Sequence, residues 1–197
     1  MSPSIAIPED PAEFFERFFP EQFTKDQHRY PPNDSPGWAL FEVIDVGCWG
    51  IRRVGNDLQV SRGRPDHTLV QISLSSEDFQ AIFVERTQRE IASRGELSDD
   101  SRDVFKPLFV DSEGAEIIDG AVSTLAFHLE HGGTPRTVFI TPGPFERTTP
   151  RATLSMRLDD FLAMLSGRKG FAGLLLWGKL KIRGDLFYAR RLSALLT

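Results

Sequence analysis

The segment "GLLLWGKLKIRGD", residues 173–185, sets an apolar run beside a short alternating pattern. The run that reaches Trp177 predicts one or two helical turns ending at Gly178, because glycine commonly terminates helices. The alternation that follows predicts a strand, since strand side chains point to opposite faces with a period of two. Its basic residues would share the solvent-facing side and its apolar residues the core side: Lys179, Lys181 and Arg183 against Leu180 and Ile182.

The segments on either side complete an order of strands followed by helices. "AVSTLAFHLEHG" (121–132), "RTVFITPG" (136–143) and "ATLSMRL" (152–158) predict three strands, and "DDFLAMLSG" (159–167) predicts a helix. After Gly184 and Asp185, "LFYARRLSALL" (186–196) predicts a helix with one apolar side and with Arg190 and Arg191 on the other. This final helix is therefore expected to cover an apolar surface.

This succession resembles the C-terminal half of the sterol carrier protein type 2 family. The residues that carry the resemblance are "DDFLAMLSG", the apolar segment after it, "WGKLKIRGD" and the closing "ARRLSALL". The likeness is strong over residues 152–197 and weaker back to residue 121. It implies an α+β fold, a small, mostly antiparallel sheet with helices on one face, in which members bind sterols, fatty acids or acyl chains in an apolar tunnel. The resemblance thus predicts binding and carriage of a hydrophobic small molecule or lipid.

A tunnel of this kind needs a concave, mostly apolar lining with few polar groups. The candidates for that lining come from the helices and the strand predicted in the C-terminal part of the chain: Phe161, Leu165, Phe171, Leu174, Leu175, Trp177, Leu180, Ile182 and Leu186. A stripe of Leu and Phe at helical spacing also makes an ordinary core. The sequence therefore leaves open whether this interior is packed or hollow.

The first part of the chain predicts a partial copy of the same pattern. Strands at 38–46, 49–54, 57–63 and 68–75 are expected to form a meander of three or four strands, and a helix is expected within 75–95. Aligning "TLVQISLSSEDFQAIF" with "RATLSMRLDDFLAML" at an offset of 82 superposes Ser73 on Ser155 and Phe79 on Phe161. We therefore hypothesise two degenerate sterol-carrier-like repeats.

Three regions follow from that hypothesis. Residues 1–37 would form an N-terminal helix and loop, residues 38–120 a degenerate first repeat with an acidic connector, and residues 121–197 the sterol-carrier-type C-terminal lobe. The connector, residues 95–120, is expected to be irregular. The N-terminal helix is expected to begin at its N-cap Asp10, with Pro11 at the first helical position, and to end at Pro20. Phenylalanines at 14, 15, 18 and 19 give it one apolar face.

Composition and charge limit the partners. The 197 residues are 40% hydrophobic and 26% charged, which is typical of a globular domain. A formal net charge of −5 argues against a nucleic-acid partner. From Ser166 onward, however, the chain contains seven Lys and Arg residues and only one acidic residue, Asp185. Solvated faces of a strand and a helix explain this basic tail, and the other interpretation is attraction to an anionic head group, a phosphate or a membrane surface, including transient membrane contact.

The first thirty residues lack the basic and apolar regions of a secretory signal, which predicts a cytoplasmic protein. The longest apolar run, residues 171–178, is too short for a membrane-spanning helix. The sequence does not predict the oligomeric state.

Enzymatic motifs are the remaining question. The chain has no Gly-x-Ser-x-Gly elbow, Walker loop or dinucleotide fingerprint, and we expect no cofactor. In a strand, "HLEH" (128–131) points His128 and Glu130 one way and His131 the other, so we expect no metal site. A cyclase or isomerase acting on a polyketide- or terpene-like substrate stays an alternative if His128 or Glu130 faces an apolar cavity, where desolvation would shift its pKa. A structural or oligomerisation module is the third alternative.

Overall fold

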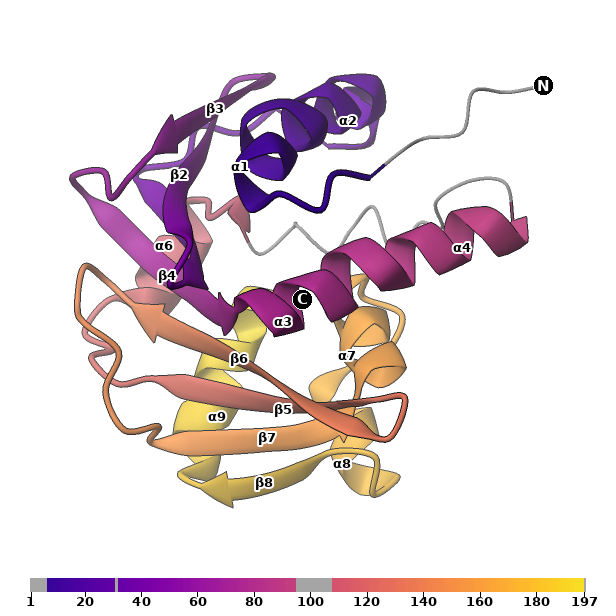
Figure 1. Ribbon diagram of the computed structural model, residues 1–197. Helices are drawn as coiled ribbons and strands as arrows, with labels where there is room; N and C mark the ends of the chain where they lie inside the picture. The colour runs from indigo at the N-terminus through magenta and orange to yellow at the C-terminus, as the bar shows by residue number, and fades with distance from the viewer. Residues whose placement is uncertain (1–6, 31, 95–107, 197) are drawn as a thin grey trace.

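The computed structural model describes residues 7–30, 32–94 and 108–196 (Figure 1). In this part of the chain eight strands form one sheet in the order β3-β2-β1-β4-β6-β5-β7-β8. The strands are β1 (Trp38–Ile44), β2 (Gly47–Val54), β3 (Asp57–Arg62), β4 (Thr68–Ser75), β5 (Leu125–His131), β6 (Thr134–Pro142), β7 (Ala152–Arg157) and β8 (Lys181–Gly184). Both halves of the chain therefore contribute to a single sheet.

The helices include one long N-terminal helix made of α1 (Pro11–Glu13), the π-helical η1 (Phe14–Phe18) and α2 (Phe19–Asp26). A second long helix consists of α3 (Ser76–Phe79), the π-helical η3 (Gln80–Glu85) and α4 (Arg86–Arg94). The others are the 3-10 helix η2 (Gln27–Arg29), α6 (Ser112–Ile118), α7 (Leu158–Leu165), α8 (Phe171–Leu176), α9 (Leu186–Ser193) and the 3-10 helix η5 (Ala194–Leu196).

The sheet is mostly antiparallel, as predicted, with two parallel pairs. β1 pairs antiparallel with β2 and parallel with β4, and β5 pairs antiparallel with β6 and parallel with β7. An antiparallel pairing of β4 with β6 joins the two halves. The meander consists of three strands, β1, β2 and β3, whereas β4 returns across the sheet to the far side of β1. The α+β fold class is confirmed.

The two halves follow the same order. Each has a hairpin, then a strand that pairs parallel with the first strand of that hairpin, and then a helix. β4 ends at Ser75 immediately before α3, and β7 ends at Arg157 immediately before α7. These two junctions lie 82 residues apart, the offset at which the two sequences align. The first half carries the additional edge strand β3, whereas the second half carries β8. A duplication explains this shared order and stays a prediction.

Two predictions about the helices were wrong. The N-terminal helix does not end at Pro20; Pro20 is the second residue of α2, directly after the π-helical η1, and the helix continues to Asp26. The acidic connector, expected to be irregular, contains α6, whose N-cap Asp111 accepts a hydrogen bond from the amide of Gly114. Residues 95–107 of that connector lie outside the described residues.

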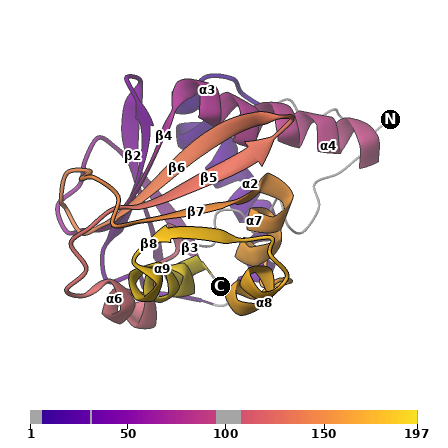
Figure 2. The same ribbon diagram turned by 90° about the horizontal axis from the view of Figure 1, so that it is seen from below.

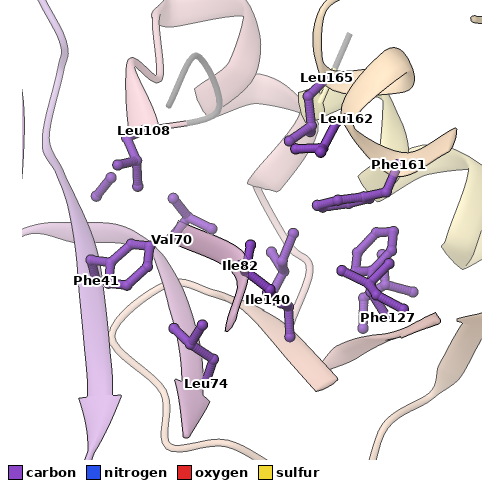
Figure 3. Packing of buried hydrophobic residues seen from close by; sticks show 14 of the residues in the cluster. Phe41, Val70, Leu74, Ile82, Leu108, Phe127, Ile140, Phe161, Leu162 and Leu165 are labelled. Carbon is purple, nitrogen blue, oxygen red and sulfur yellow. The ribbon is translucent and has the colours of Figure 1, made fainter. Parts of the chain in front are cut away.

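One apolar core fills the space between the sheet and the helices (Figure 3). Phe41, Ile72, Ile140 and Leu125 pair in register across four strands, so their side chains share one face. The ring of Phe15 in η1 lies 4.6 Å, centroid to centroid, from that of Phe41. The N-terminal phenylalanines at 14, 15, 18 and 19 are all buried against this face. Figure 2 shows α8 and α9 beneath the other end of the sheet.

Candidate functional site

The interior of the second half begins with α7, which packs on β5 and β7. Leu158, Phe161, Leu162 and Leu165 recur at helical spacing and are all buried. The ring of Phe161 lies 5.1 Å from that of Phe127, centroid to centroid, on the apolar face of β5. α7 therefore places two of the predicted lining residues, Phe161 and Leu165, over the sheet.

The turn after α8 explains why the chain buries Leu174 and then Leu180. Gly178 has a φ of +67°, the left-handed conformation that glycine adopts without strain. The amide of Gly178 donates to the carbonyl of Leu175 at 3.1 Å, and the amide of Lys179 donates to that of Leu174 at 2.9 Å. These two bonds make a Schellman motif, which ends α8 and sends the chain back along the sheet as β8.

The start of α9 closes this interior at the other end of β8. Asp185 is its N-cap and accepts a hydrogen bond from the amide of Tyr188 at 2.9 Å. That amide, with the Arg151 guanidinium 2.8 Å from the carboxylate, lowers the pKa of Asp185 below its usual range. Gly184 must be glycine, because a Cβ there would lie 2.4 Å from the carbonyl oxygen of Arg151. The Gly-Asp pair in the sequence thus fixes where the last helix begins.

Tyr188 brings a polar group into the same region. Its hydroxyl donates a hydrogen bond to the carbonyl of Ser123, and the Arg151 guanidinium lies 5.1 Å from its ring centroid. Burial raises the pKa of the Tyr188 hydroxyl, so the group stays protonated and acts as a donor. Nothing in the sequence indicates this hydrogen bond.

The structure divides the nine predicted lining residues into two sets. Four are buried and two are partly buried in the core between the sheet, α7 and α8: Phe161, Leu165, Leu174 and Leu180, with Phe171 and Ile182. Leu175, Trp177 and Leu186 are exposed and do not join this interior. The sequence alone does not separate the buried from the exposed residues. α8 has only six residues, so a small change in where the helix ends changes which of its side chains face the core.

A second feature is a groove of about 690 Å³, lined by residues of β5, β6, β7, β8 and α7 and of the turns beside them. His128, Ser155 and Lys181 are direct neighbours across β5, β7 and β8 and line it. Ion pairs join two of its acids to two of its bases: Asp160 with Lys169, and Asp159 with Arg157. The sequence analysis did not predict this groove.

His128 and Glu130 both lie on the wall of this groove and are exposed. They do not face the apolar interior, which is the condition that the pocket-enzyme alternative required. Among the described residues, no group of three His, Cys, Asp or Glu side chains is placed to hold a metal ion.

Comparison with known protein families now identifies this half of the chain. Residues 105–197 match the model of the SCP-2 sterol transfer family. The resemblance to sterol carrier protein type 2 is confirmed. The match begins earlier than residue 121, where the likeness in the sequence faded, and it includes α6, the sheet strands from β5 onward and all the helices that cover them.

Solved structures of sterol carrier proteins are similar to this chain over about half of its length. Sterol carrier protein 2 from Yarrowia lipolytica in its apo form is 19% identical, with a TM-score of 0.37, over 50% of this chain and 84% of that one. Sterol carrier protein 2 from Aedes aegypti in complex with palmitate is 16% identical, with a TM-score of 0.34, over 52% of this chain and 100% of that one. No curated protein matches the chain. No helix in the described residues is both long and apolar enough to span a membrane.

Proposed function

We propose that the second half of the protein binds a long apolar molecule, such as a sterol, a fatty acid or an acyl chain, between its sheet and helices, and that the protein carries this ligand. The observation that supports the proposal most is the match of residues 105–197 to the SCP-2 sterol transfer family. The residues within that match supply a wall of apolar side chains from α7, from α8 and from the turn before β8: Phe161, Leu165, Leu174 and Leu180.

The chemistry of this wall favours an apolar ligand. Each methylene that leaves water for such an interior contributes about 0.8 kcal/mol, so a long acyl chain gains affinity without any charged anchor. The polar groups near the end of the site, Tyr188 and Arg151, already have partners within the protein and lie where α9 begins. They would meet only the polar end of a ligand, which suits a carrier that accepts a class of lipids.

Two measurements test the proposal. Protein purified from cells is extracted with organic solvent and the extract is analysed by mass spectrometry, and the delipidated protein is titrated with a fluorescent fatty acid. We expect co-purified lipid in the extract and saturable probe binding that an unlabelled fatty acid or sterol displaces. Native mass spectrometry that shows only ligand-free protein, together with no displaceable probe binding, would contradict the proposal.

The aligned halves supply a matched pair of variants for that titration. Phe161→Leu changes the proposed ligand wall, and Phe79→Leu makes the same change at the aligned position in the first half, where Phe79 is equally buried. Both variants should lose roughly 1–2 kcal/mol of stability. Only Phe161→Leu should change the affinity for the probe, by roughly tenfold, which corresponds to 1.4 kcal/mol. Equal affinities for the two variants would place the ligand elsewhere.

A further inference from the structure

Exposed apolar side chains gather around β8. Nine large apolar side chains of the described residues are exposed, and five of them lie between residues 175 and 187. Three of the five are almost fully exposed: Leu176 at 86%, Trp177 at 81% and Phe187 at 83%. A surface this rich in large apolar groups on a small stretch of chain marks a contact with another molecule more often than chance exposure does.

The backbone holds these side chains outward. The Schellman motif at Gly178 fixes the end of α8 so that Leu174 is buried at 2% exposure while Leu176 and Trp177 point away from the core. At the other end of β8, the Asp185 cap fixes α9 so that Tyr188 is buried, while the preceding residue, Phe187, points about 100° away around the helix and is exposed. The exposure is therefore a property of the folded structure.

The same stretch of chain also carries basic side chains. Lys179, Lys181, Arg183 and Arg190 are all exposed, and within the described residues none of them forms an ion pair. The only acid between residues 175 and 190 is Asp185, which the Arg151 guanidinium neutralises. In Figure 1 β8 is the lower edge of the sheet, with α8 at one end, and α9 starts at the other end, as Figure 2 also shows. We name this surface, residues 175–190, the β8 edge.

Exposed large apolar side chains together with unpaired cations complement the surface of an anionic bilayer. Tryptophan and phenylalanine side chains enter the boundary between head groups and acyl chains, while Lys and Arg keep their charges at the phosphates. Each cation near the surface adds attraction to an anionic leaflet. A second copy of the chain fits this surface less well, because a symmetric contact would bring the same four cations together.

We propose that the β8 edge docks the protein onto an anionic phospholipid surface, with Leu176, Trp177 and Phe187 entering the interface. This surface is separate from the apolar interior, so docking does not depend on the proposed ligand binding. It goes beyond that function because it specifies where the protein meets a membrane and which lipid charge it prefers.

Vesicle co-sedimentation tests the proposal on the full chain. Phosphatidylcholine vesicles are compared with vesicles that also contain phosphatidylserine, at low and at high salt. The wild-type protein should partition at least about tenfold more strongly onto the anionic vesicles, and salt should weaken this binding because it screens the cations. Partitioning that does not depend on phosphatidylserine would overturn the assignment of the lipid charge.

Two variants and one control locate the surface. L176S/W177S and K179E/K181E should each lower partitioning onto anionic vesicles by roughly tenfold or more. F145S is the matched control, because Phe145 is also an exposed aromatic residue but lies in the loop after β6, and it should bind like the wild type. Thermal unfolding confirms that the variants are folded, as their side chains are exposed and contribute little to stability.

The outcomes separate docking from ligand binding and from self-association. The docking variants should retain full affinity for the fluorescent fatty acid, so the loss of either activity alone identifies which proposal has failed. Unchanged partitioning of L176S/W177S would overturn the docking surface. A wild-type dimer in size-exclusion chromatography that L176S/W177S converts to a monomer would overturn it as well, because the β8 edge would then cover a second copy.

Discussion

The two halves of the molecule share a strand order but are covered in different ways. Over the first half, rings from the N-terminal helix fill the core, and the ring of Phe15 lies 4.6 Å from Phe41, 5.1 Å from Trp49 and 5.9 Å from Phe79, centroid to centroid. Over the second half, α7, α8 and α9 cover the sheet with mostly aliphatic side chains, among them Leu162, Leu165, Leu174 and Leu192.

The two halves therefore differ more in the helices that cover them than in the order of their strands. The first half is covered by the N-terminal helix, which lies outside the segment that aligns with the second half. The rigid rings on that helix pack against the rings of the sheet and make a packed core. The second half is covered by helices from its own segment, joined through the glycines at 178 and 184, and this is the segment that matches the sterol transfer family. We therefore expect stability to depend most on the first half and ligand affinity on the second.

The largest loss of stability should come from Phe15→Ala, in the core of the first half. Phe15 is fully buried and contacts rings from three elements, so its removal leaves a cavity that rigid neighbours cannot fill. We expect a loss of about 4 kcal/mol in the free energy of unfolding, measured by urea titration. Variants that still fold should bind the fluorescent fatty acid with unchanged affinity. A loss below about 1 kcal/mol would mean that the N-terminal helix is not part of the core.

A smaller effect should follow from breaking the contact between the halves. Asp78 in α3 accepts a hydrogen bond from the amide of Thr137 at 3.1 Å and lies 3.4 Å from the Arg136 guanidinium. Both charged side chains are mostly buried, so Asp78→Ala should cost roughly 2 kcal/mol.

Glu77→Ala is the control for this contact. Glu77 lies closer to Arg136, at 2.8 Å, but its side chain is 79% exposed, so the cost should stay below about 1 kcal/mol. Equal losses of unfolding free energy in Asp78→Ala and Glu77→Ala would show that burial does not decide how much each contact with Arg136 contributes.

The smallest effect concerns the two aligned helix starts. The Ser75 hydroxyl accepts a hydrogen bond from the amide of Asp78 at 3.0 Å, whereas Arg157, the aligned residue before α7, makes no side-chain cap. Ser75→Ala should therefore cost about 1 kcal/mol, and Arg157→Ser should gain up to about 1 kcal/mol. Thermal unfolding measures the change in stability of both variants. A loss of stability in Arg157→Ser would show that the two helix starts are not equivalent.

The sequence predicted the elements of the second half well because local chemistry specifies them. The turn at residue 178 has a left-handed backbone, which favours glycine, and there is no room for a side chain at Gly184. Asp185 caps the helix that follows. Each of these boundaries can therefore be predicted from the residues at that boundary. The return of β4 to the far side of β1 was not predicted, because strand order depends on non-local pairing that alternating side chains do not encode.

The candidate site was only partly predictable for a related reason. An apolar run shows that some side chains are buried, but in the six-residue helix α8 it does not show which ones, so Trp177 and Leu174 looked alike in the sequence. α6 was missed because its seven residues lie in an acidic segment with too few apolar positions to show a period. The groove arises from neighbours on three strands, which the sequence brings together only through folding.

The most direct test of the account is an NMR experiment that locates an isotope-labelled C16 fatty acid bound to the protein. Ligand binding between the sheet and the helices of the second half predicts intermolecular NOEs from the acyl chain to Phe161, Leu165 and Leu174. NOEs to Phe15 and Phe41 instead, or to His128 and Ser155 in the groove, would contradict the account.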